Sequence, residues 1–458
     1  MRVAWFSPVP PVKSGIAGRS TELVDALRGR GYAIDVYVDD PVARLAAGVR
    51  SAHEFVWLHA QRPYDLTVYQ FGNSSHHEYE WAYAFRYPGL VVLHDTHLHH
   101  ARAESLLRDL RFGDYRTEFV FDNPEASVDL AELAVNGFDS SLYYRWPLVR
   151  TLVATARMVV AHGEGAAEEL RSHFADAPSL AERISSITLG EGEAISPARE
   201  DAARRTVRMR HGWPDDAVVF GVFGGISPEK RIDQIVAAFE AVLPALPSAR
   251  LLLAGAPAFH YDLAGALTGR AAADRIAVPG YLATDEALTE YIAACDVTLN
   301  LRWPTARETS GPWLRALAAG RPTIVIDLVH QRRTPSIDPR TWWPNQRDAP
   351  VCVAIDILDE DHSLRLAMRR LGRDAVLRAD LGRAAAAWWA REHTVERMAD
   401  DYERAMDEAR RRSALPGSDV PAHLRSSHAE TLRAIVPRFG PDVSERTARC
   451  IDFGDDGL

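Results

Sequence analysis

The 458-residue chain is poor in cysteine and carries no excess of positive charge. Its three cysteines, Cys295, Cys352 and Cys450, are far apart and lack metal-type spacing, which argues against a disulfide framework or a zinc site. The formal net charge of -10 argues against a dedicated nucleic-acid binder. A G-x-G-x-x-G segment is also missing, which disfavours a dinucleotide-dependent oxidoreductase.

Long apolar runs are missing as well. No uninterrupted apolar segment reaches membrane-spanning length, and the first β pattern runs into Pro8 without the apolar core of a signal peptide. What is present is an ordinary globular balance, with 47% apolar and 25% charged residues, over a length that allows two or three domains. We therefore expect a soluble cytoplasmic protein, with peripheral membrane contact left open.

An α/β alternation begins at the first residues. The pattern at 2–6 predicts a buried strand, which is followed by a small-residue turn, a helix to about residue 30 and a second strand at 34–38. Such a unit is the usual start of a doubly wound sheet. Further strands are expected at 65–69, 89–93 and 158–161, and the segment 184–189 is expected to end the first domain. The residues at 103–146 are interpreted as a helical insertion or lid.

A second α/β series follows a polar, charged segment at 193–210, which we interpret as a linker. Two successive series imply an α/β protein with two Rossmann-like domains facing each other across a cleft, with the ligand where strand ends meet. The expected organisation is an N-terminal domain at 1–192, a C-terminal domain at 193–385, a crossover helix at 386–412 and a tail at 413–458.

The stretch 297–326 is predicted to form a strand, a polar loop, a helix and a strand. Ser310 and Gly311 precede Pro312, and proline is favoured at the first position of a helix. The loop therefore brings residues 308–310 to a helix N-terminus, where free N–H groups and the positive end of the dipole favour an anion. A carboxylate beside such a site fits a ligand that also offers hydroxyls, such as a sugar diphosphate.

Six short segments carry a family resemblance: 10–17, 69–73, 93–95, 223–230, 280–281, and 308–311 with 315–322. On these segments the chain resembles the retaining, nucleotide-sugar-dependent glycosyltransferases of the GT-B fold, family 4 type, over nearly its whole length to about Arg412. The resemblance implies transfer of a sugar from a nucleotide-diphosphate donor to an acceptor hydroxyl with retained anomeric configuration. Polysaccharide, glycolipid or natural-product glycoside synthesis is the implied setting.

The resemblance implies a donor site built on three loops, at 13–15, 224–230 and 308–311. Lys230 would meet the donor diphosphate, where a fixed positive charge stabilises the departing nucleotide. Glu308 would accept hydrogen bonds from sugar hydroxyls, and Gly15 would let the backbone of the first domain approach the phosphates. A solvated lysine, a surface glutamate and an ordinary turn glycine are the alternatives for these three residues. The expected donor-binding set is Gly15, Gly225, Lys230, Arg231, Tyr281, Arg302, Glu308, Thr309, Ser310 and Gly311.

His94 stands at the end of the strand at 89–93, where the family has a histidine beside the reacting sugar. Together with Lys230 and Glu308 it forms the expected catalytic set. The histidines that follow at 97–100 invite a metal interpretation, but ligand spacing with a carboxylate or thiolate is missing. We therefore expect no metal and interpret them as solvent-facing residues at a helix start. The expected acceptor-side residues are Asn73, His77 and Asp95, and His77 has the capping of a turn as its alternative.

Two positions depart from the family pattern. Gly225 stands where the family usually has an arginine, so one positive charge beside the diphosphate is missing; Arg231, Arg302 or Arg307 could replace it. Arg315 stands where a second glutamate would bind the nucleotide ribose, and an arginine cannot accept hydroxyl hydrogens. The ribose is therefore held otherwise, the donor is unusual, or catalysis is impaired.

The expected mechanism uses no cofactor and no carboxylate as a covalent nucleophile. Negative charge develops on the leaving diphosphate, so cations and helix N–H groups would supply the stabilisation. The expected partners are a nucleotide-sugar donor and a hydroxyl acceptor. Two alternatives stay open: a sugar-nucleotide epimerase of the same architecture, and a catalytically silent partner subunit that binds a sugar nucleotide.

Overall fold

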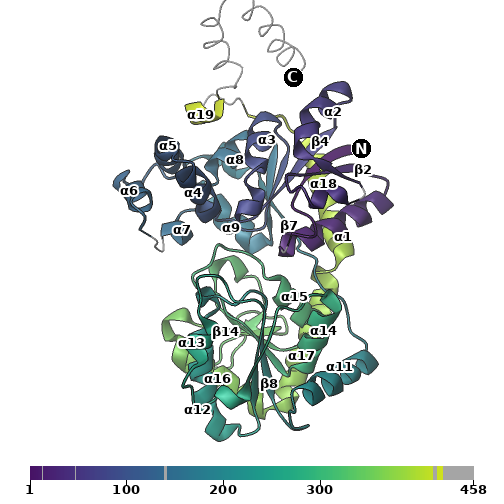
Figure 1. Cartoon of the computed structure of the whole chain (residues 1–458), viewed down its shortest axis with the longest axis vertical. Helices are drawn as coiled ribbons and strands as arrows, with labels where there is room; N and C mark the ends of the chain where they lie inside the picture. The colour runs from purple at the N-terminus through teal and green to yellow at the C-terminus, as the bar shows by residue number, and fades with distance from the viewer. Residues whose placement is uncertain (13, 47, 139–141, 416–419, 426–458) are drawn as a thin grey trace, which may run out of the picture. The chain divides into compact units, whose positions relative to one another are not determined.

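The computed structural model describes residues 1–12, 14–46, 48–138, 142–415 and 420–425 (Figure 1). Contacts within the chain divide it into two compact units. The first unit contains residues 1–161 and 170–185 and the described residues from 402 on, and the second contains 162–169 and 186–401. The chain therefore passes between the units three times before residue 402 and then returns.

The first unit is built on a parallel sheet that has seven strands within the described residues, in the order β3-β2-β1-β4-β5-β6-β7. The chain winds outward from β1 to β3 and then returns beside β1 with β4, so the direction of winding reverses between β1 and β4. Side chains of β4 and β5 are buried on both faces. The strands are β1 (Arg2–Phe6), β2 (Ala33–Val38), β3 (Val49–Ser51), β4 (Leu66–Phe71), β5 (Leu90–Leu93), β6 (Met158–His162) and β7 (Ile184–Ile187).

The second unit repeats this plan with seven described strands in the order β10-β9-β8-β11-β12-β14-β13. Alternate residues of its strands point into two separate layers. Phe220 and Val222 of β8 pack with helices α12 and α16, whereas Val219 and Phe223 pack with α11, α14 and α15. The strands are β8 (Val219–Phe223), β9 (Arg250–Ala254), β10 (Ile276–Gly280), β11 (Val297–Asn300), β12 (Thr323–Ile326), β13 (Ser336–Ile337) and β14 (Cys352–Ile355).

The helices connect the strands and cover the sheets. Those before the second sheet are α1 (Gly15–Gly29), α2 (Phe55–Gln61), α3 (Glu80–Arg86), α4 (His99–Arg108), α5 (Phe112–Asp122), α6 (Asp129–Val135), α7 (Leu142–Arg145), α8 (Arg150–Thr155), α9 (Glu164–His173), α10 (Pro178–Ala181) and α11 (Pro197–Arg210). Those that follow are α12 (Ile232–Val242), α13 (Leu263–Leu267), α14 (Asp285–Ala294), α15 (Gly311–Ala318), α16 (Glu360–Arg373), α17 (Ala375–Glu392), α18 (Val395–Arg411) and α19 (Ala422–Arg425).

Short 3-10 helices mark several of the connections. They are η1 (Ala43–Leu45), η2 (Ala52–Glu54), η3 (Ser75–His77), η4 (Pro228–Lys230), η5 (Leu243–Ala245), η6 (Ala273–Arg275), η7 (Val329–Gln331) and η8 (Ile357–Asp359). Two of them, η3 and η4, follow strands at the carboxyl edges of the two sheets. Both carry residues of the predicted site.

The helical character expected for residues 103–146 is confirmed by α4 to α7. These helices have a small core of their own, in which Leu106 of α4 packs with Tyr115 and Phe119 of α5. A buried ion pair between Arg102 and Glu118, with Nε 2.8 Å from the carboxylate, ties α4 to α5. Whether this insertion acts as a lid stays a prediction.

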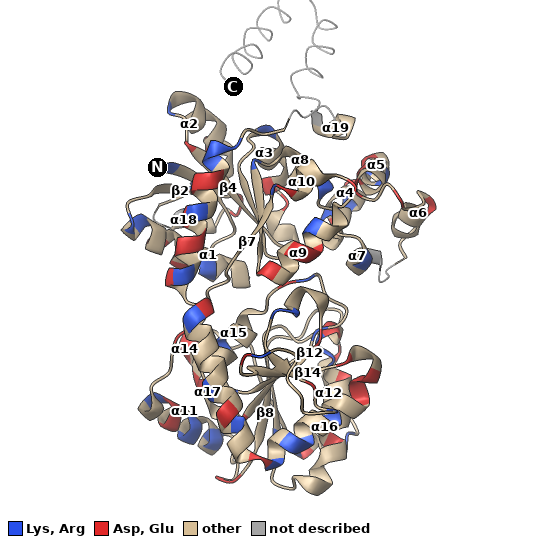
Figure 2. Ribbon diagram, turned by 180° about the vertical axis from the view of Figure 1, so that it is seen from behind, with Lys and Arg blue, Asp and Glu red and all other residues tan. Residues whose placement is uncertain are grey.

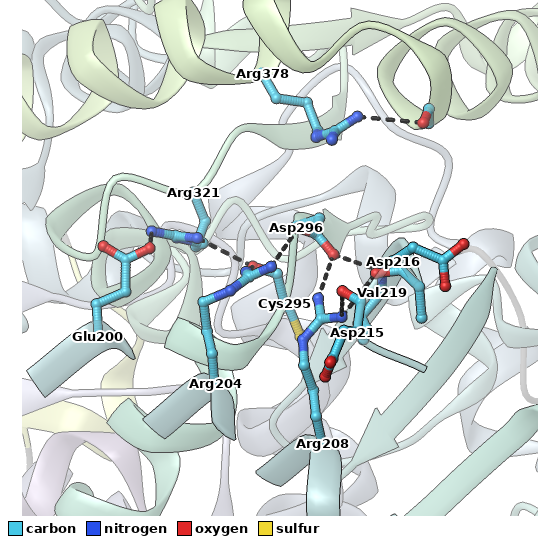
Figure 3. A network of polar contacts seen from close by, with 12 residues as sticks. Glu200, Arg204, Arg208, Asp215, Asp216, Val219, Cys295, Asp296, Arg321 and Arg378 are labelled. Carbon is cyan, nitrogen blue, oxygen red and sulfur yellow. Dashed lines mark hydrogen bonds and ion pairs between the residues drawn. The ribbon is translucent and has the colours of Figure 1, made fainter. Parts of the chain in front are cut away.

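The prediction of a linker at 193–210 is wrong for most of these residues, because residues 197–210 form α11. Basic residues recur along this helix (Figure 2). Two of them are neutralised inside the second unit, where Arg204 and Arg208 lie 2.9 and 2.8 Å from the two oxygens of Asp296 (Figure 3). The same carboxylate accepts the N–H of Val219 at 2.8 Å. The polar pattern therefore marks a helix whose charges are paired against the sheet.

The crossover helix is continuous through the boundary between the two units. Residues 375–392 form α17, and α18 contains the passage from the second unit to the first between Asp401 and Tyr402. Of the predicted tail, α19 is described, while Cys450 lies outside the described residues. In the part of the chain that the structure describes, no helix has the length and apolar content of a membrane span.

Candidate functional site

Lys230 ends the loop that follows β8 and is only 6% exposed. Its ammonium group donates a hydrogen bond to the carbonyl oxygen of Phe223, at the end of the same strand. A Cβ atom at Gly224 would lie 3.0 Å from the Lys230 Nζ and 3.3 Å from the Cγ of Pro312, and the φ of +84° there also favours glycine. Gly224 therefore leaves room between the lysine and the start of α15.

Burial and, to a smaller extent, the nearby Arg302 lower the pKa of Lys230 and Glu308 raises it, so that the pKa is about 7. A lysine in this position is close to losing its proton at neutral pH unless an anion joins it. The group therefore has a strong electrostatic preference for a negatively charged ligand.

Glu308 lies in the loop before α15 and is held from two sides. Its carboxylate forms an ion pair with Arg302 and accepts a hydrogen bond of 2.8 Å from the Thr305 hydroxyl. The N–H of Trp303 donates to the carbonyl oxygen of Glu229 at 2.7 Å, which joins this loop to the lysine loop. Lys230, Arg302 and Glu308 are thereby brought together within the second unit.

The start of α15 lies at the end of the glutamate loop. Ser310 is the N-cap: its hydroxyl accepts the N–H of Trp313 at 3.4 Å and donates to the Asn300 side chain at 2.8 Å. Gly311 is the first helical residue, so its N–H belongs to the turn that lacks partners within the helix. Thr309 turns its hydroxyl to the carbonyl oxygen of His162 at 3.3 Å. The arrangement offers two cations and a helix N-terminus beside a carboxylate.

The three arginines considered as replacements at Gly225 have different positions. Arg302 reaches the site through Glu308. Arg231 instead pairs with Glu360 of α16, with Nε 2.8 Å from the carboxylate, and Arg307 pairs with Glu169 at 2.8 Å. A Cβ atom at Gly225 would meet only the carbonyl oxygen of residue 256, at 4.0 Å. The donor-binding role of Arg231 stays a prediction, and the contacts favour Arg302 as the second cation.

Arg315 is anchored in a network of its own. Its Nε lies 2.5 Å from the carboxylate of Glu191, which is nearly buried, and its outer nitrogen lies 3.0 Å from Asp285. Asp285 is 71% exposed at the start of α14. Two carboxylates therefore accompany the arginine at the position where the resemblance implies a single glutamate. Tyr281 is more than half exposed directly after β10, and Gly15 is exposed at the start of α1.

His94 lies at the carboxyl edge of the first sheet, directly after β5. Its Nε2 lies 2.8 Å from the side-chain oxygen of Gln70, a buried residue of β4. Asn73 and Asp95 lie together beyond the same two strands, because the Asp95 carboxylate accepts the Asn73 N–H at 2.8 Å. The Asn73 side chain in turn caps α4 by accepting the N–H of Ala101 at 2.9 Å. Gln70, which lies within the segment 69–73, was not among the predicted site residues.

His77, expected on the acceptor side, is 1% exposed and its Nδ1 lies 3.0 Å from the Glu80 carboxyl group. Burial lowers the pKa of His77 to about 3 and raises the pKa of Glu80 well above its ordinary value. Burial therefore favours the uncharged form of both groups in this hydrogen-bonded pair. Direct contact with an acceptor would require this ring to be uncovered, and the acceptor role stays a prediction.

The histidines after His94 are not the solvent-facing group expected from the sequence. His99 is fully buried with its Nε2 2.9 Å from the Tyr115 hydroxyl, His97 is 7% exposed, and only His100 is exposed. They face inward because α4 packs its first turn against the helical insertion. Across the described residues no group of three or more histidine, cysteine, aspartate or glutamate side chains is arranged to hold a metal ion.

A cavity of about 530 Å³ opens at the carboxyl edge of the first sheet. Apolar side chains in its lining include Val9 and Val12, which follow β1, and Val38 at the end of β2. Asp39, Asp40 and Glu78 supply carboxylates from the ends of β2 and from the segment after β4. Such a lining combines apolar contact with several hydroxyl acceptors.

Comparisons with known proteins agree with this geometry. Residues 217–337, which contain Lys230, Arg302 and Glu308, match the model of a family described as Glycosyl transferases group 1. No curated protein sequence matches the chain at a significant level.

Solved structures with low sequence identity are similar over most of the chain. They include HepE of Anabaena in complex with UDP-glucose (16% identity, TM-score 0.55, 89% of this chain and 99% of that chain) and sucrose-phosphate synthase of Thermosynechococcus elongatus (16%, 0.61, 89% and 98%). The catalytic domain of starch synthase IV of Arabidopsis thaliana, bound to ADP and acarbose, is also similar (13%, 0.55, 90% and 99%). The fold is GT-B.

The fold class expected from the sequence, α/β with two doubly wound sheets, is therefore confirmed. The family model and the GT-B fold together support a glycosyltransferase.

Proposed function

We propose that this GT-B protein is a retaining glycosyltransferase of family 4 type, which moves a sugar from a nucleotide-diphosphate donor to an acceptor hydroxyl. One observation carries the proposal: Lys230, Arg302 and Glu308 gather beside the start of α15, inside the segment that matches the glycosyltransferase family model. A diphosphate fits the two cations and the helix N–H groups, and sugar hydroxyls fit the carboxylate.

In the proposed reaction the bond between the anomeric carbon and the donor phosphate oxygen breaks, so that negative charge develops on the leaving diphosphate. The acceptor oxygen forms the new bond to the anomeric carbon, and its proton passes to the leaving diphosphate. Lys230 and Arg302 stabilise the negative charge that develops on the diphosphate. Because both side chains are already in position before the reaction begins, no reorganisation is needed in the transition state. Glu308 orients the sugar through its hydroxyls. These groups provide the stabilisation without a metal ion, so we expect activity to persist in EDTA.

The first test is donor binding. Thermal-shift measurements with UDP-, GDP-, TDP- and ADP-sugars identify the donor, because a ligand that binds the native state raises its apparent stability. UDP-glucose and ADP-glucose come first, since similar structures hold UDP-glucose and ADP. Binding by wild-type protein and loss of binding in Lys230→Met support the proposal. Failure of every sugar nucleotide to bind the wild-type protein would contradict it.

The second test is turnover and stereochemistry. With the donor identified, a panel of hydroxylated acceptors is assayed for nucleotide release, and the anomeric configuration of the product is read by NMR coupling constants. We expect the acceptor to use the cavity beside Asp39 and Asp40. A product of inverted configuration would contradict the retaining assignment, and activity abolished by EDTA and restored by Mg²⁺ would contradict metal independence.

A catalytically silent sugar-nucleotide binder is the second candidate, and the environment of Arg315 favours it. The arginine is held by Glu191 and Asp285 and offers no acceptor for ribose hydroxyls. This candidate predicts tight donor binding without turnover for any acceptor. An epimerase is distinguished by formation of an epimer from the donor alone.

A further inference from the structure

Gln70 and Tyr402 meet beside His94, although they come from distant parts of the chain. The Gln70 side-chain oxygen lies 2.8 Å from the His94 Nε2 and 3.1 Å from the Tyr402 hydroxyl, which is contributed by α18. Gln70 and Tyr402 are each 1% exposed, while His94 is partly exposed at the sheet edge. The supporting pair is therefore buried below a histidine that solvent or a ligand can reach.

The chemistry of this contact restricts the histidine. An amide oxygen is only an acceptor, so both neighbours must donate to it. Burial raises the pKa of Tyr402 well above its ordinary value, which keeps its hydroxyl protonated and able to donate. The remaining donor must be the Nε2–H of His94, so the contact requires a proton on Nε2.

The surroundings hold the supporting pair in place. Gln70 lies in the interior of the sheet, in register with Val92 of β5, the strand that ends just before His94. Tyr402 packs against Trp5 of β1 with ring centroids 5.5 Å apart. Tyr402 is also the first residue of α18 that belongs to the first unit. The C-terminal helix therefore contributes to the carboxyl edge of the first sheet.

We infer that Gln70 and Tyr402 are positioning residues for His94, holding its ring in one orientation with the proton on Nε2. The effect on transfer rests on the proposed function, in which His94 lies beside the reacting sugar. A ring that is fixed before the reaction loses little entropy in the transition state. A ring freed from Gln70 also samples orientations that are not productive for sugar transfer. The orientation and the tautomer themselves are properties of the free protein.

The first experiment needs no substrate. In full-length protein labelled with ¹⁵N-histidine, the His94 signals are assigned by their loss in His94→Gln, and the ring nitrogens report which one carries the proton. We expect Nε2 protonated in wild-type and in Gln70→Glu, which keeps an oxygen acceptor, and a mixture of tautomers in Gln70→Leu. Wild-type protein with the proton on Nδ1, or an unchanged His94 signal in folded Gln70→Leu, overturns the inference.

Tyr69→Phe is the matched control. Tyr69 is also buried, but its hydroxyl donates to the carbonyl oxygens of Tyr87 and Tyr83, at 2.8 and 3.1 Å, away from His94. Both Tyr69→Phe and Tyr402→Phe remove one buried hydroxyl, so their losses of stability should be similar. Only Tyr402→Phe should change the His94 signals, and equal changes in both variants contradict a specific role.

The second experiment measures transfer with the identified donor. Gln70→Leu should lower kcat on the order of tenfold and leave KM for the donor within about twofold, because the ring acts in the transition state. Gln70→Glu should recover part of kcat. A rise in KM alone, or no recovery in Gln70→Glu, counts against positioning. If no sugar nucleotide turns over at all, the proposed function fails while the NMR result still decides the inference.

Discussion

The second unit places Lys230, Arg302 and Glu308 at the carboxyl edge of its sheet, whereas the first unit places Gln70 and His94 at the corresponding edge. The two sheets have the same winding, in which the chain returns beside the starting strand and reverses direction. The two clusters differ in charge. Lys230, Arg302 and Glu308 are charged groups in close contact, whereas His94 is held by the uncharged side-chain amide of Gln70.

This difference shows how burial decides which chemistry an edge supports. In the first unit burial has removed charge from the pair of His77 and Glu80, because it shifts both pKa values toward the neutral forms. In the second unit the pKa of Lys230 is lowered only to about 7, because the negative charge of Glu308 favours the protonated lysine and opposes the effect of burial. In the proposed function Lys230 meets an anion at the second edge, and the Gln70 side chain positions His94 at the first.

The largest expected effect comes from removing the cation at the charged edge. Lys230→Met should lower kcat/KM for the donor by a factor of about 10² to 10³, because a preorganised electrostatic partner of the leaving group is lost. Steady-state kinetics with the identified donor measure this. Arg231→Gln is the control: it removes the adjacent charge, which is directed to Glu360, and should change kcat/KM less than threefold or so. Equal losses in both variants would contradict the assignment of Lys230.

Glu308→Gln should have a smaller effect than the loss of Lys230. The amide keeps one acceptor oxygen but loses the charge that holds Arg302, so we expect a decrease in kcat/KM on the order of tenfold to a hundredfold. Glu360→Gln serves as the matched control. It removes another carboxylate of the second unit, the one that pairs with Arg231. Glu308→Gln with wild-type kinetics would show that the carboxylate does not meet the sugar.

The buried pair of His77 and Glu80 at the first edge is tested by measuring the stability of variants. His77→Ala should lower the free energy of unfolding by about 2–4 kcal/mol, because it leaves a cavity and an unpaired Glu80 carboxyl group. Glu80→Gln should cost about 1 kcal/mol or less at pH 7, since burial favours the uncharged form of this carboxyl group and the amide is uncharged as well. Chemical denaturation measures both. A large loss in Glu80→Gln would indicate a charged pair and remove the contrast between the two edges.

The pH dependence of the same pair follows from its pKa shifts. The raised pKa of Glu80 contributes stability that is lost as pH rises through its folded value. The lowered pKa of His77 contributes stability that is present above its ordinary pKa of 6.5 and lost as pH falls toward about 3. Glu80→Gln should therefore remove part of the decrease in stability on the alkaline side.

Much of the fold follows from local sequence patterns. Apolar runs predicted most strands, and the order of polar loops after them predicted which residues share an edge. Ser310 and Gly311 before Pro312 identified the start of α15 to the residue, because capping chemistry is local. The loops that carry Lys230 and Glu308 were found for the same reason.

What could not be predicted depends on partners far away in the sequence. The segment with Arg204 and Arg208 seemed too polar for a packed helix because Asp296, which neutralises both, lies about ninety residues later. Tyr402 lies 332 residues from Gln70, and their contact leaves no local pattern. Arg315 and Glu191 are likewise 124 residues apart. Such pairs become visible only when the chain is folded.

The pH dependence of donor binding sharpens the contrast between the edges. Lys230 in the free protein is half protonated near pH 7, and a bound diphosphate should raise its pKa. Donor affinity should therefore increase as pH falls toward 7, by about fivefold between pH 8 and pH 7, and level off below that. Calorimetry in buffers of different ionisation enthalpy should detect proton uptake on binding at pH 8. Uptake that persists in Lys230→Met would assign the proton to another group.

The smallest expected effect is a gain, from Gly225→Arg. The position has open space around its Cβ, and its φ lies outside the left-handed region, so a side chain fits without backbone strain. An added cation beside Lys230 and Arg302 should tighten donor binding about threefold to tenfold at low salt and less at high salt, because exposed charges are screened. Gly225→Gln, of similar length without charge, is the control. If both variants bind the donor equally, the charged edge already holds as much positive charge as the diphosphate requires, and Arg302 has fully replaced the missing arginine.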